Sequence, residues 1–117
     1  MPTYRVNEDA VAQARKLIDD GTYDADTEWS DAAPSADDEN AEIERHSYAG
    51  YGRWHLAIDP DANEETKKRH AFPYGDFRKV YRSALIAAKQ RAAQNDHDAI
   101  EKAADGLLEH LDAERDG

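Results

Sequence analysis

The positive charge of this acidic chain is concentrated between residues 67 and 94. That segment holds eight lysines and arginines against one acid, Asp76, whereas the whole chain of 117 residues has a net charge of −11. Grouped cations of this kind can bind phosphates or acidic surfaces. The eight bases are Lys67, Lys68, Arg69, Arg78, Lys79, Arg82, Lys89 and Arg91.

A helix over residues 77–94 would collect part of this charge on one face. At 100° per residue, Arg78, Arg82 and Lys89 lie within roughly 40° of one another, opposite an apolar side. These three residues and Lys79 are called the basic ridge below. Arg91 falls on the apolar side, where a cation needs either a carboxylate partner or a route to solvent.

The ridge has two interpretations. In the first, a partner docks on the ridge and on the loop 72–77, and the flanking binding residues are Lys67, Lys68, Arg69 and Tyr74. In the second, the ridge pairs with the chain's own acidic segment, residues 24–44. The leading functional hypothesis is therefore a non-enzymatic interaction domain with an unknown protein partner.

Nucleic acid is the alternative partner for the same bases. Each phosphate contact changes log K by about −0.9 per tenfold rise in salt, so three contacts lose roughly 500-fold. In a salt-rich cytoplasm such a site needs base stacking or shape recognition as well. The protein-partner hypothesis is preferred for this reason.

Histidines near carboxylates suggest a third hypothesis, a metal-dependent enzyme. Glu42 and His46 have i, i+4 spacing, which can place two ligands on one helix face. The other pairings are His55 with Asp59 and His97 with Asp98, and His110 stands on the last predicted helix. Such pairs arise easily by chance in a chain this rich in acids, so the sequence assigns no catalytic residue, metal ligand or cofactor.

Other kinds of chemistry lack their motifs. The chain has no cysteine, which excludes a thiolate nucleophile and a disulfide framework. No serine stands in the context of an activated nucleophile, and no glycine-rich loop has phosphate-binding spacing.

The composition indicates a halophilic cytoplasm. Aspartate outnumbers glutamate, arginine outnumbers lysine, and alanine is abundant. In molar salt the Debye length falls to about 3 Å, so acidic self-repulsion is largely screened; an acidic mesophilic protein is the alternative. No signal peptide and no membrane span are expected. The oligomeric state stays open.

The first half of the chain contains one clear helix and one ambiguous segment. Asn7 is a good N-cap for a helix that Gly21 would end, and "TYRV" before it reads as extended. Ser35 and Asp38 resemble a capping box for a second helix. Residues 46–58 favour a helix by aromatic spacing, although alternation leaves a short strand or hairpin near 54–58 open.

The second half reads as helical. Asn63 is expected to cap a short helix and Asp76 to cap the longest one, residues 77–94. The last helix has apolar residues at the spacing of one face, from Ile100 to Leu111. The predicted fold class is all-α: a single domain over residues 1–117 with four to five helices and a C-terminal αα-hairpin. An acidic loop is expected at about 22–36, and its mobility is left open.

Several segments together resemble a known family. The resemblance rests on "YRVNEDAVAQARKLID", "ADDEN", "WHLAID", "FPYGDFRKVYRSALIAAKQRA" and "IEKAADGLLEHLD". The chain thus resembles a family of uncharacterised, short, standalone prokaryotic proteins of haloarchaea and actinobacteria. The most specific portion is "YGDFRKVYRSALIA", residues 74–87. The resemblance implies no catalytic or binding residue.

Overall fold

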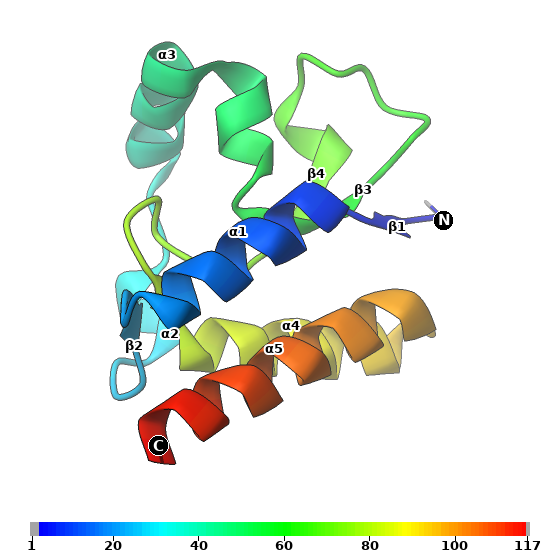
Figure 1. Ribbon diagram of the computed structural model, residues 1–117. Coiled ribbons are helices and arrows are strands. Elements are labelled where there is room, and N and C mark those ends of the chain that lie inside the picture. The colour runs from blue at the N-terminus through cyan, green and yellow to red at the C-terminus, as the bar shows by residue number, and fades with distance from the viewer. Residues whose placement is uncertain (1–2, 117) are drawn as a thin grey trace.

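The computed structural model describes residues 3–116, which form five α-helices, five short strands and one 3₁₀ helix (Figure 1). The helices are α1 (Glu8–Asp19), α2 (Trp29–Ala32), α3 (Ala36–Gly52), α4 (Arg82–Gln94) and α5 (Asp98–Asp116). The strands are β1 (Arg5–Val6), β2 (Tyr23–Asp24), β3 (His55–Ile58), β4 (His70–Pro73) and β5 (Val80–Tyr81). The fold is therefore mixed, and the all-α prediction is wrong.

The strands form two small sheets. Antiparallel strands in the order β1-β3-β4 make the larger one, in which Arg5 pairs with Ile58 and Ala57 pairs with Ala71. A parallel pair joins β2 to β5. These pairings are long-range, and short strands joined by distant residues give little local signal in a sequence.

Local capping at α1 agrees with the prediction. The Asn7 side-chain oxygen accepts a hydrogen bond from the Ala10 N–H, and Gly21 follows the helix with a φ of 76°. Asn7 also connects distant elements, since its amide nitrogen donates to the carbonyl oxygens of Gly52 and His55. The cap thus holds the start of α1 against the start of β3.

The ambiguous segment 46–58 contains both a helix and a strand. The Ser35–Asp38 capping box is present at the start of α3, which continues to Gly52 through a kink at Ser47, where φ is 64°. β3 then follows after a short turn. The strand that the sequence left open near 54–58 is therefore present, and the favoured helix ends at Gly52.

The longest predicted helix begins later than expected, at Arg82. The Asp76 carboxylate accepts hydrogen bonds from the N–H groups of Arg78 and Lys79, so it caps a tight turn instead of a helix. Phe77 has a φ of 70°, which no helix accommodates. Asn63 behaves similarly: it caps a turn at Glu65, and the helix predicted there is reduced to a 3₁₀ turn at Lys67–Arg69.

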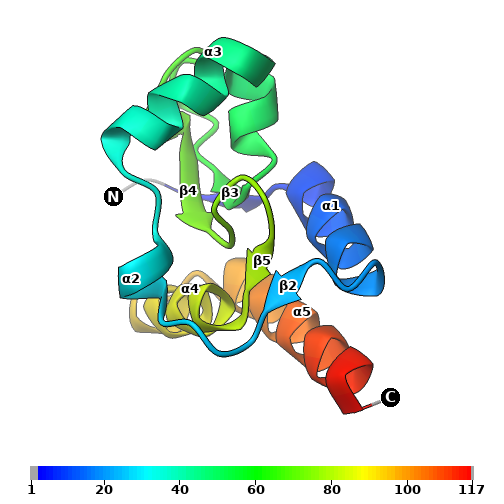
Figure 2. The same cartoon turned by 90° about the vertical axis from the view of Figure 1, so that its left-hand side faces the viewer.

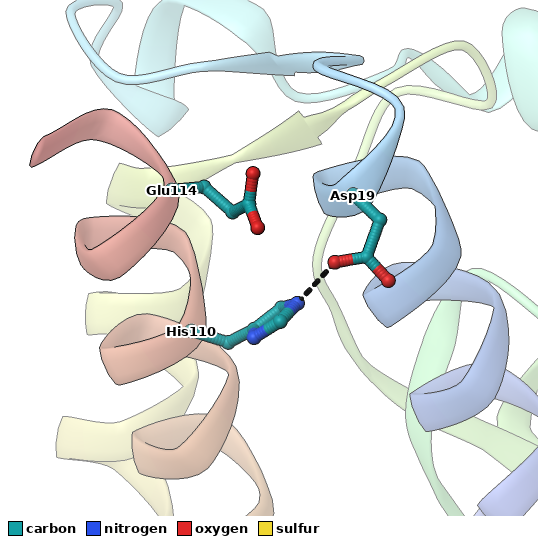
Figure 3. Close-up of side chains that lie close together, drawn as sticks. All are labelled: Asp19, His110 and Glu114. Carbon is teal, nitrogen blue, oxygen red and sulfur yellow. Dashed lines mark hydrogen bonds and ion pairs between the residues drawn. The ribbon is translucent and has the colours of Figure 1, made fainter. Parts of the chain in front are cut away.

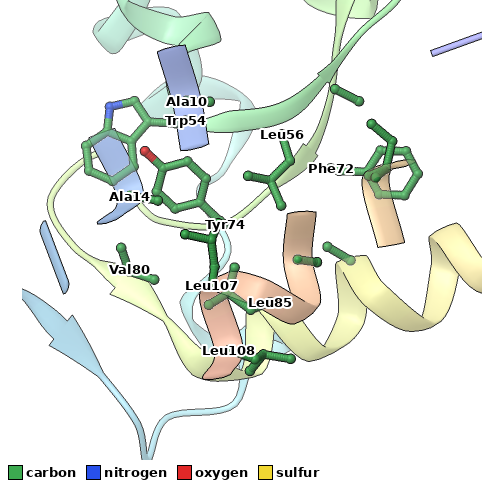
Figure 4. Packing of buried hydrophobic residues seen from close by; sticks show 14 of the residues in the cluster. Ala10, Ala14, Trp54, Leu56, Phe72, Tyr74, Val80, Leu85, Leu107 and Leu108 are labelled. Carbon is green, nitrogen blue, oxygen red and sulfur yellow. The ribbon is translucent and has the colours of Figure 1, made fainter. Parts of the chain in front are cut away.

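The C-terminal αα-hairpin is confirmed. α4 and α5 run side by side in opposite directions, and α1 packs against α5 (Figure 1). Their facing residues are buried, among them Leu85 and Ala92 on α4 and Ile100 and Leu107 on α5. Trp54, Leu56 and Tyr74 extend the same core toward the sheet (Figure 4).

The expected acidic loop at 22–36 contains two short elements. β2 pairs with β5, and Trp29 on α2 lies with its ring 5.6 Å from the ring of Tyr81. Figure 2 shows α3 and β4 on one side of the molecule and the α4–α5 hairpin on the other. Within residues 3–116, no helix combines the length and the apolar character that crossing a bilayer requires.

Candidate functional site

The basic ridge lies against acidic residues of its own chain. The Arg82 guanidinium makes two hydrogen bonds to the Asp112 carboxylate, with Nε–Oδ1 at 2.8 Å and Nη2–Oδ2 at 3.1 Å. These bonds raise the pKa of Arg82 and lower the pKa of Asp112. Lys89 pairs in the same way with Asp105 at 2.7 Å. Both acids belong to α5, which the sequence did not identify as the partner of the ridge.

Lys79 contacts the acidic segment that was predicted to pair with it. Its Nζ lies 3.8 Å from Asp24 Oδ2. The pKa of Asp24 is lowered to about 2, first by the Thr27 hydroxyl and then by the N–H groups of Thr27 and Asp26, with Lys79 as a lesser cause. Three of the four ridge cations therefore have an internal carboxylate partner, while their side chains stay partly exposed.

The remaining predicted site residues are dispersed. Arg78 and Lys68 are exposed, and within residues 3–116 neither forms an ion pair. Lys67 pairs with Glu39 at 3.3 Å, and Arg69 donates to the Ala62 carbonyl oxygen.

Tyr74 belongs to the core and not to the protein surface. It is fully buried, and its hydroxyl donates to the Arg53 carbonyl oxygen at 2.8 Å while it accepts from Gln13 at 3.1 Å. Its ring stacks on Trp54 with a centroid separation of 5.3 Å. The structure thus places Arg82 and Lys89 on the α4–α5 hairpin, Lys79 and Arg78 in the segment before it, and Tyr74 in the core.

A cavity of about 390 Å³ lies between β4, the end of α3 and the end of α4. Its walls are formed by residues that are far apart in the sequence, so no local motif indicates the cavity. We call it the histidine pocket; its principal residues are Tyr4, Tyr51, His55, His70, Phe72, Arg91 and His97.

One wall of the histidine pocket is aromatic. The rings of Tyr4, Phe72 and His97 meet edge to face, with centroid separations of 5.1 to 5.9 Å. Phe72 is buried and has a φ of 61°, a conformation that is unusual for a bulky residue. Backbone outliers of this kind cluster at ligand sites.

The other wall contains two histidines whose rings pack at an angle against Tyr51. The Tyr51 ring centroid lies 4.5 Å from that of His55 and 5.7 Å from that of His70. His55 Nδ1 lies 3.0 Å from the Tyr51 carbonyl oxygen, which can only accept, so His55 carries its proton on Nδ1 and leaves Nε2 as an acceptor.

His70 is the unusual member of this wall. Both of its ring nitrogens are buried, and neither has a hydrogen-bond partner within residues 3–116. The ring lies so close to Gly52 that a Cβ there would be 2.7 Å from His70 Nδ1. A buried polar atom without a partner costs about 1–3 kcal/mol, so this position calls for an explanation.

Burial keeps these imidazoles neutral at pH 7. Desolvation lowers the pKa of His55 to about 4. The pKa of His70 is lowered by burial first and by the Arg69 charge second. Each ring therefore presents one donor and one acceptor, and neither adds a positive charge to the pocket.

The charged groups that line the pocket are Glu39 and Arg91, whose formal charges cancel. Glu39 is its acid, and that carboxylate already contacts Lys67 Nζ at 3.3 Å and the Tyr51 hydroxyl at 3.4 Å. Arg91 is exposed and forms no ion pair within the described residues. Of the two expectations for Arg91, a carboxylate partner or a route to solvent, the structure has the second. The sequence also singled out His55, His97 and the loop 72–77, parts of which line this pocket.

The histidine–carboxylate pairs that are close in sequence form no ion pairs among the described residues. Within residues 3–116, only His110 contacts a carboxylate, and that is Asp19 and not a neighbour in sequence. His46 is exposed on α3 without such a contact, and His55 and His97 line the histidine pocket instead.

Comparisons with known proteins add no relatives. No protein-family model, no curated protein and no solved structure matches the chain.

Proposed function

We propose that this protein is a non-enzymatic binding domain and that the histidine pocket holds its ligand, a small aromatic anion. The observation that carries the proposal is the pair of buried, unpartnered nitrogens of His70 at the pocket wall. The ring edge that carries them faces Gly52, so a rotation of the His70 side chain would bring a nitrogen to the hydrogen-bonding group of a bound molecule. No other pocket-lining side chain has this need within the described residues.

Size and wall chemistry support a small ligand. The volume of about 390 Å³ lies at the lower end of the range of about 300–1,000 Å³ that is usual for ligand pockets. Tyr4, Phe72 and His97 already pack edge to face, and a planar ring inserted beside them would gain the same contacts.

Charge favours an anion. Within the described residues Arg91 forms no ion pair, whereas the one pocket acid, Glu39, is engaged by Lys67. A guanidinium binds a carboxylate through two parallel hydrogen bonds, a geometry that a point charge does not provide. The pocket therefore offers an anion a favourable place in a chain whose overall charge is −11.

Binding is proposed in preference to catalysis because the buried histidines are weak bases. A general base works best when its pKa lies near the working pH. Burial lowers the pKa of His55 to about 4 and also lowers the pKa of His70, so both imidazoles are weaker bases than a free histidine side chain. We place the protein in the cytoplasm of a halophile, in line with its aspartate-rich composition.

An NMR titration tests the proposal. Benzoate and 2-naphthoate are added to ¹⁵N-labelled protein in molar KCl, with benzamide and acetate as probes that lack the charge or the ring. We expect saturable shifts at the amides of Ala71, Phe72 and His97 with the aryl carboxylates. Arg91→Met and His70→Phe should each weaken binding at least about tenfold, as the loss of a charge-assisted or buried hydrogen bond predicts.

Arg15→Met is the matched control. Arg15 is also an exposed helical arginine without an ion pair in the described part of the chain, but it does not line the pocket. Affinity should be unchanged in this variant. Equal binding by the wild type, Arg91→Met and His70→Phe would reject the pocket, and so would the absence of any pocket shift with either aryl carboxylate.

A macromolecular partner on the ridge is the second candidate. Arg78 favours it, because its guanidinium is exposed and without an ion pair among the described residues, and it lines a hollow beside Phe77 and Arg45. Replacing Arg78, Arg82 and Lys89 together by Ala separates docking from internal pairing. Loss of a partner captured in molar KCl without loss of stability supports docking, and capture of nucleic acid by the wild type would identify the alternative partner.

A further inference from the structure

Three potential metal ligands converge between α1 and α5, away from the histidine pocket. His110 and Glu114 are four residues apart on α5, so they share one helix face, and Asp19 is the last residue of α1. One ligand atom from each lies within 4.8 Å of the others. Figure 3 shows the three side chains pointing toward a common space.

The backbone that carries these ligands is fixed by the core. Ile18 and Leu111, the neighbours of Asp19 and His110 in sequence, have no exposed surface. The two helices therefore hold their ligands at a constant separation, while the exposed carboxylates keep the freedom to turn. Sites on rigid elements are the ones that hold a defined coordination geometry.

The negative potential at the cluster of Asp19, His110 and Glu114 favours a bound cation. Asp19 and Glu114 both lie in the last turn of a helix, where the unpaired carbonyl groups already produce a negative potential. Within residues 3–116, neither carboxylate pairs with a lysine or arginine, because the nearby Arg115 contacts Asp112. The one basic group in contact with them is the His110 imidazole, which lies 2.6 Å from Asp19.

We propose that Asp19, His110 and Glu114 bind a divalent transition metal of the Zn²⁺ type. One imidazole and two carboxylates suit zinc and its neighbours, whereas Mg²⁺ and Ca²⁺ prefer sets made of oxygen alone. Bonds of about 2.1 Å place two ligand atoms at most about 4.2 Å apart, so small rotations of the exposed carboxylates close the site. Water completes the coordination.

The consequence of metal binding is a cross-link between the first and the last helix. The ion would bind the folded state and not the unfolded chain, so it would stabilise the fold in proportion to its concentration. This inference is independent of the histidine pocket, since it uses none of the pocket residues.

Cobalt spectroscopy and zinc calorimetry on tag-free protein test the site. We expect one Co²⁺ per chain, seen as visible absorption bands, displacement of Co²⁺ by Zn²⁺, and a higher melting temperature with Zn²⁺. Millimolar Mg²⁺ should not compete. His110→Ala should abolish the bands, and Asp19→Asn and Glu114→Gln should each weaken binding at least about tenfold.

His46→Ala is the matched control, since His46 and Glu42 have the same i, i+4 spacing on α3 as His110 and Glu114. Its affinity for Co²⁺ should equal that of the wild type. Circular dichroism confirms that His110→Ala is folded. The absence of Co²⁺ bands in the wild type, or bands that persist in His110→Ala, would overturn the assignment.

Discussion

At the scale of single residues, His70 is the strongest indication that the histidine pocket binds a ligand. Its nitrogens are buried without partners in the described chain, a state that folding alone does not favour. Natural proteins accept such local costs mainly at sites that bind something else. Stability and binding should therefore respond to this residue in opposite directions.

We expect His70→Phe to raise the free energy of unfolding by about 1 kcal/mol, because an apolar ring of similar shape removes two unsatisfied polar atoms. Urea unfolding in molar KCl measures the change. His46→Phe, on an exposed part of α3, should stay within about 0.5 kcal/mol of the wild type. If His70→Phe were strongly destabilising, His70 would have a structural partner after all.

His55 should make stability depend on pH between about 6.5 and 4. Its pKa is lowered to about 4 in the folded state, so the unfolded chain takes up the proton first as pH falls. Stability is then complete above about pH 6.5 and is lost progressively down to about pH 4, by about 3 kcal/mol. The contribution of Asp24, whose pKa is lowered to about 2, is lost only at more acidic pH.

Comparing urea unfolding of the wild type and His55→Gln at several pH values isolates this effect. The difference between the two proteins should change by about 3 kcal/mol between pH 7 and pH 4. A difference that stays constant over this range would mean that His55 takes up its proton as readily in the folded protein as in the unfolded chain.

At the scale of elements, two glycines offer opposite tests of packing. A Cβ at Gly75 would overlap the Lys79 carbonyl oxygen and lie 2.7 Å from Trp54 Cζ3. A Cβ on Gly106, inside α5, would meet no atom within 4 Å among residues 3–116, apart from the adjoining backbone of its own helix. The same substitution should therefore have opposite effects on stability.

We expect Gly75→Ala to lower the free energy of unfolding by about 1–3 kcal/mol through overpacking. Gly106→Ala should raise it by about 0.5–1 kcal/mol, because alanine restricts the unfolded chain and favours a helix. Thermal unfolding of both variants beside the wild type provides the measurement. Equal effects of the same sign would show that the turn at Gly75 is not closely packed.

Elements with local signals were predictable from the sequence. Asn7 and Gly21 delimit α1, and the Ser35–Asp38 box starts α3, because a cap depends on a few adjacent residues. Aspartate is a common N-cap residue, but Asp76 caps a tight turn and not the predicted helix. The segment after it is held by β5, whose partner β2 is more than fifty residues earlier in the chain.

The candidate site was less predictable than the fold. The ridge cations were identified, yet their partners Asp105 and Asp112 lie on α5, and only the αα-hairpin brings them together. The histidine pocket depends on the pairing of β3 with β4 and on a kinked α3, neither of which has a local motif. The sequence singled out Arg91, His55, His97 and the loop 72–77 for separate reasons, and none of those reasons placed them in one pocket.

At the scale of the whole molecule, the net charge of −11 should make stability depend on salt. Between 0.1 M and 1 M KCl the Debye length falls from about 10 Å to about 3 Å, which screens repulsion among the acids. Screening also weakens the few surface ion pairs. Each of them contributes at most about 1 kcal/mol to the free energy of unfolding, so this loss is small.

We expect the melting temperature, measured by circular dichroism, to rise by on the order of 10 °C over this range of KCl. Sorbitol at matched osmolarity controls for effects that are not ionic and should raise it much less. Cooperative unfolding at the same temperature with and without salt would contradict the proposed adaptation.

The open edge of the larger sheet has a consequence at high ionic strength. β4 is an outer strand, and unpaired strand edges are templates for joining other chains. Surface charge, the common safeguard, is ineffective when it is screened. Here the backbone itself obstructs the edge, since Phe72 is in a left-handed conformation and Pro73 has no N–H to donate. The β4 edge thus has a protection against pairing with other chains that added salt does not weaken.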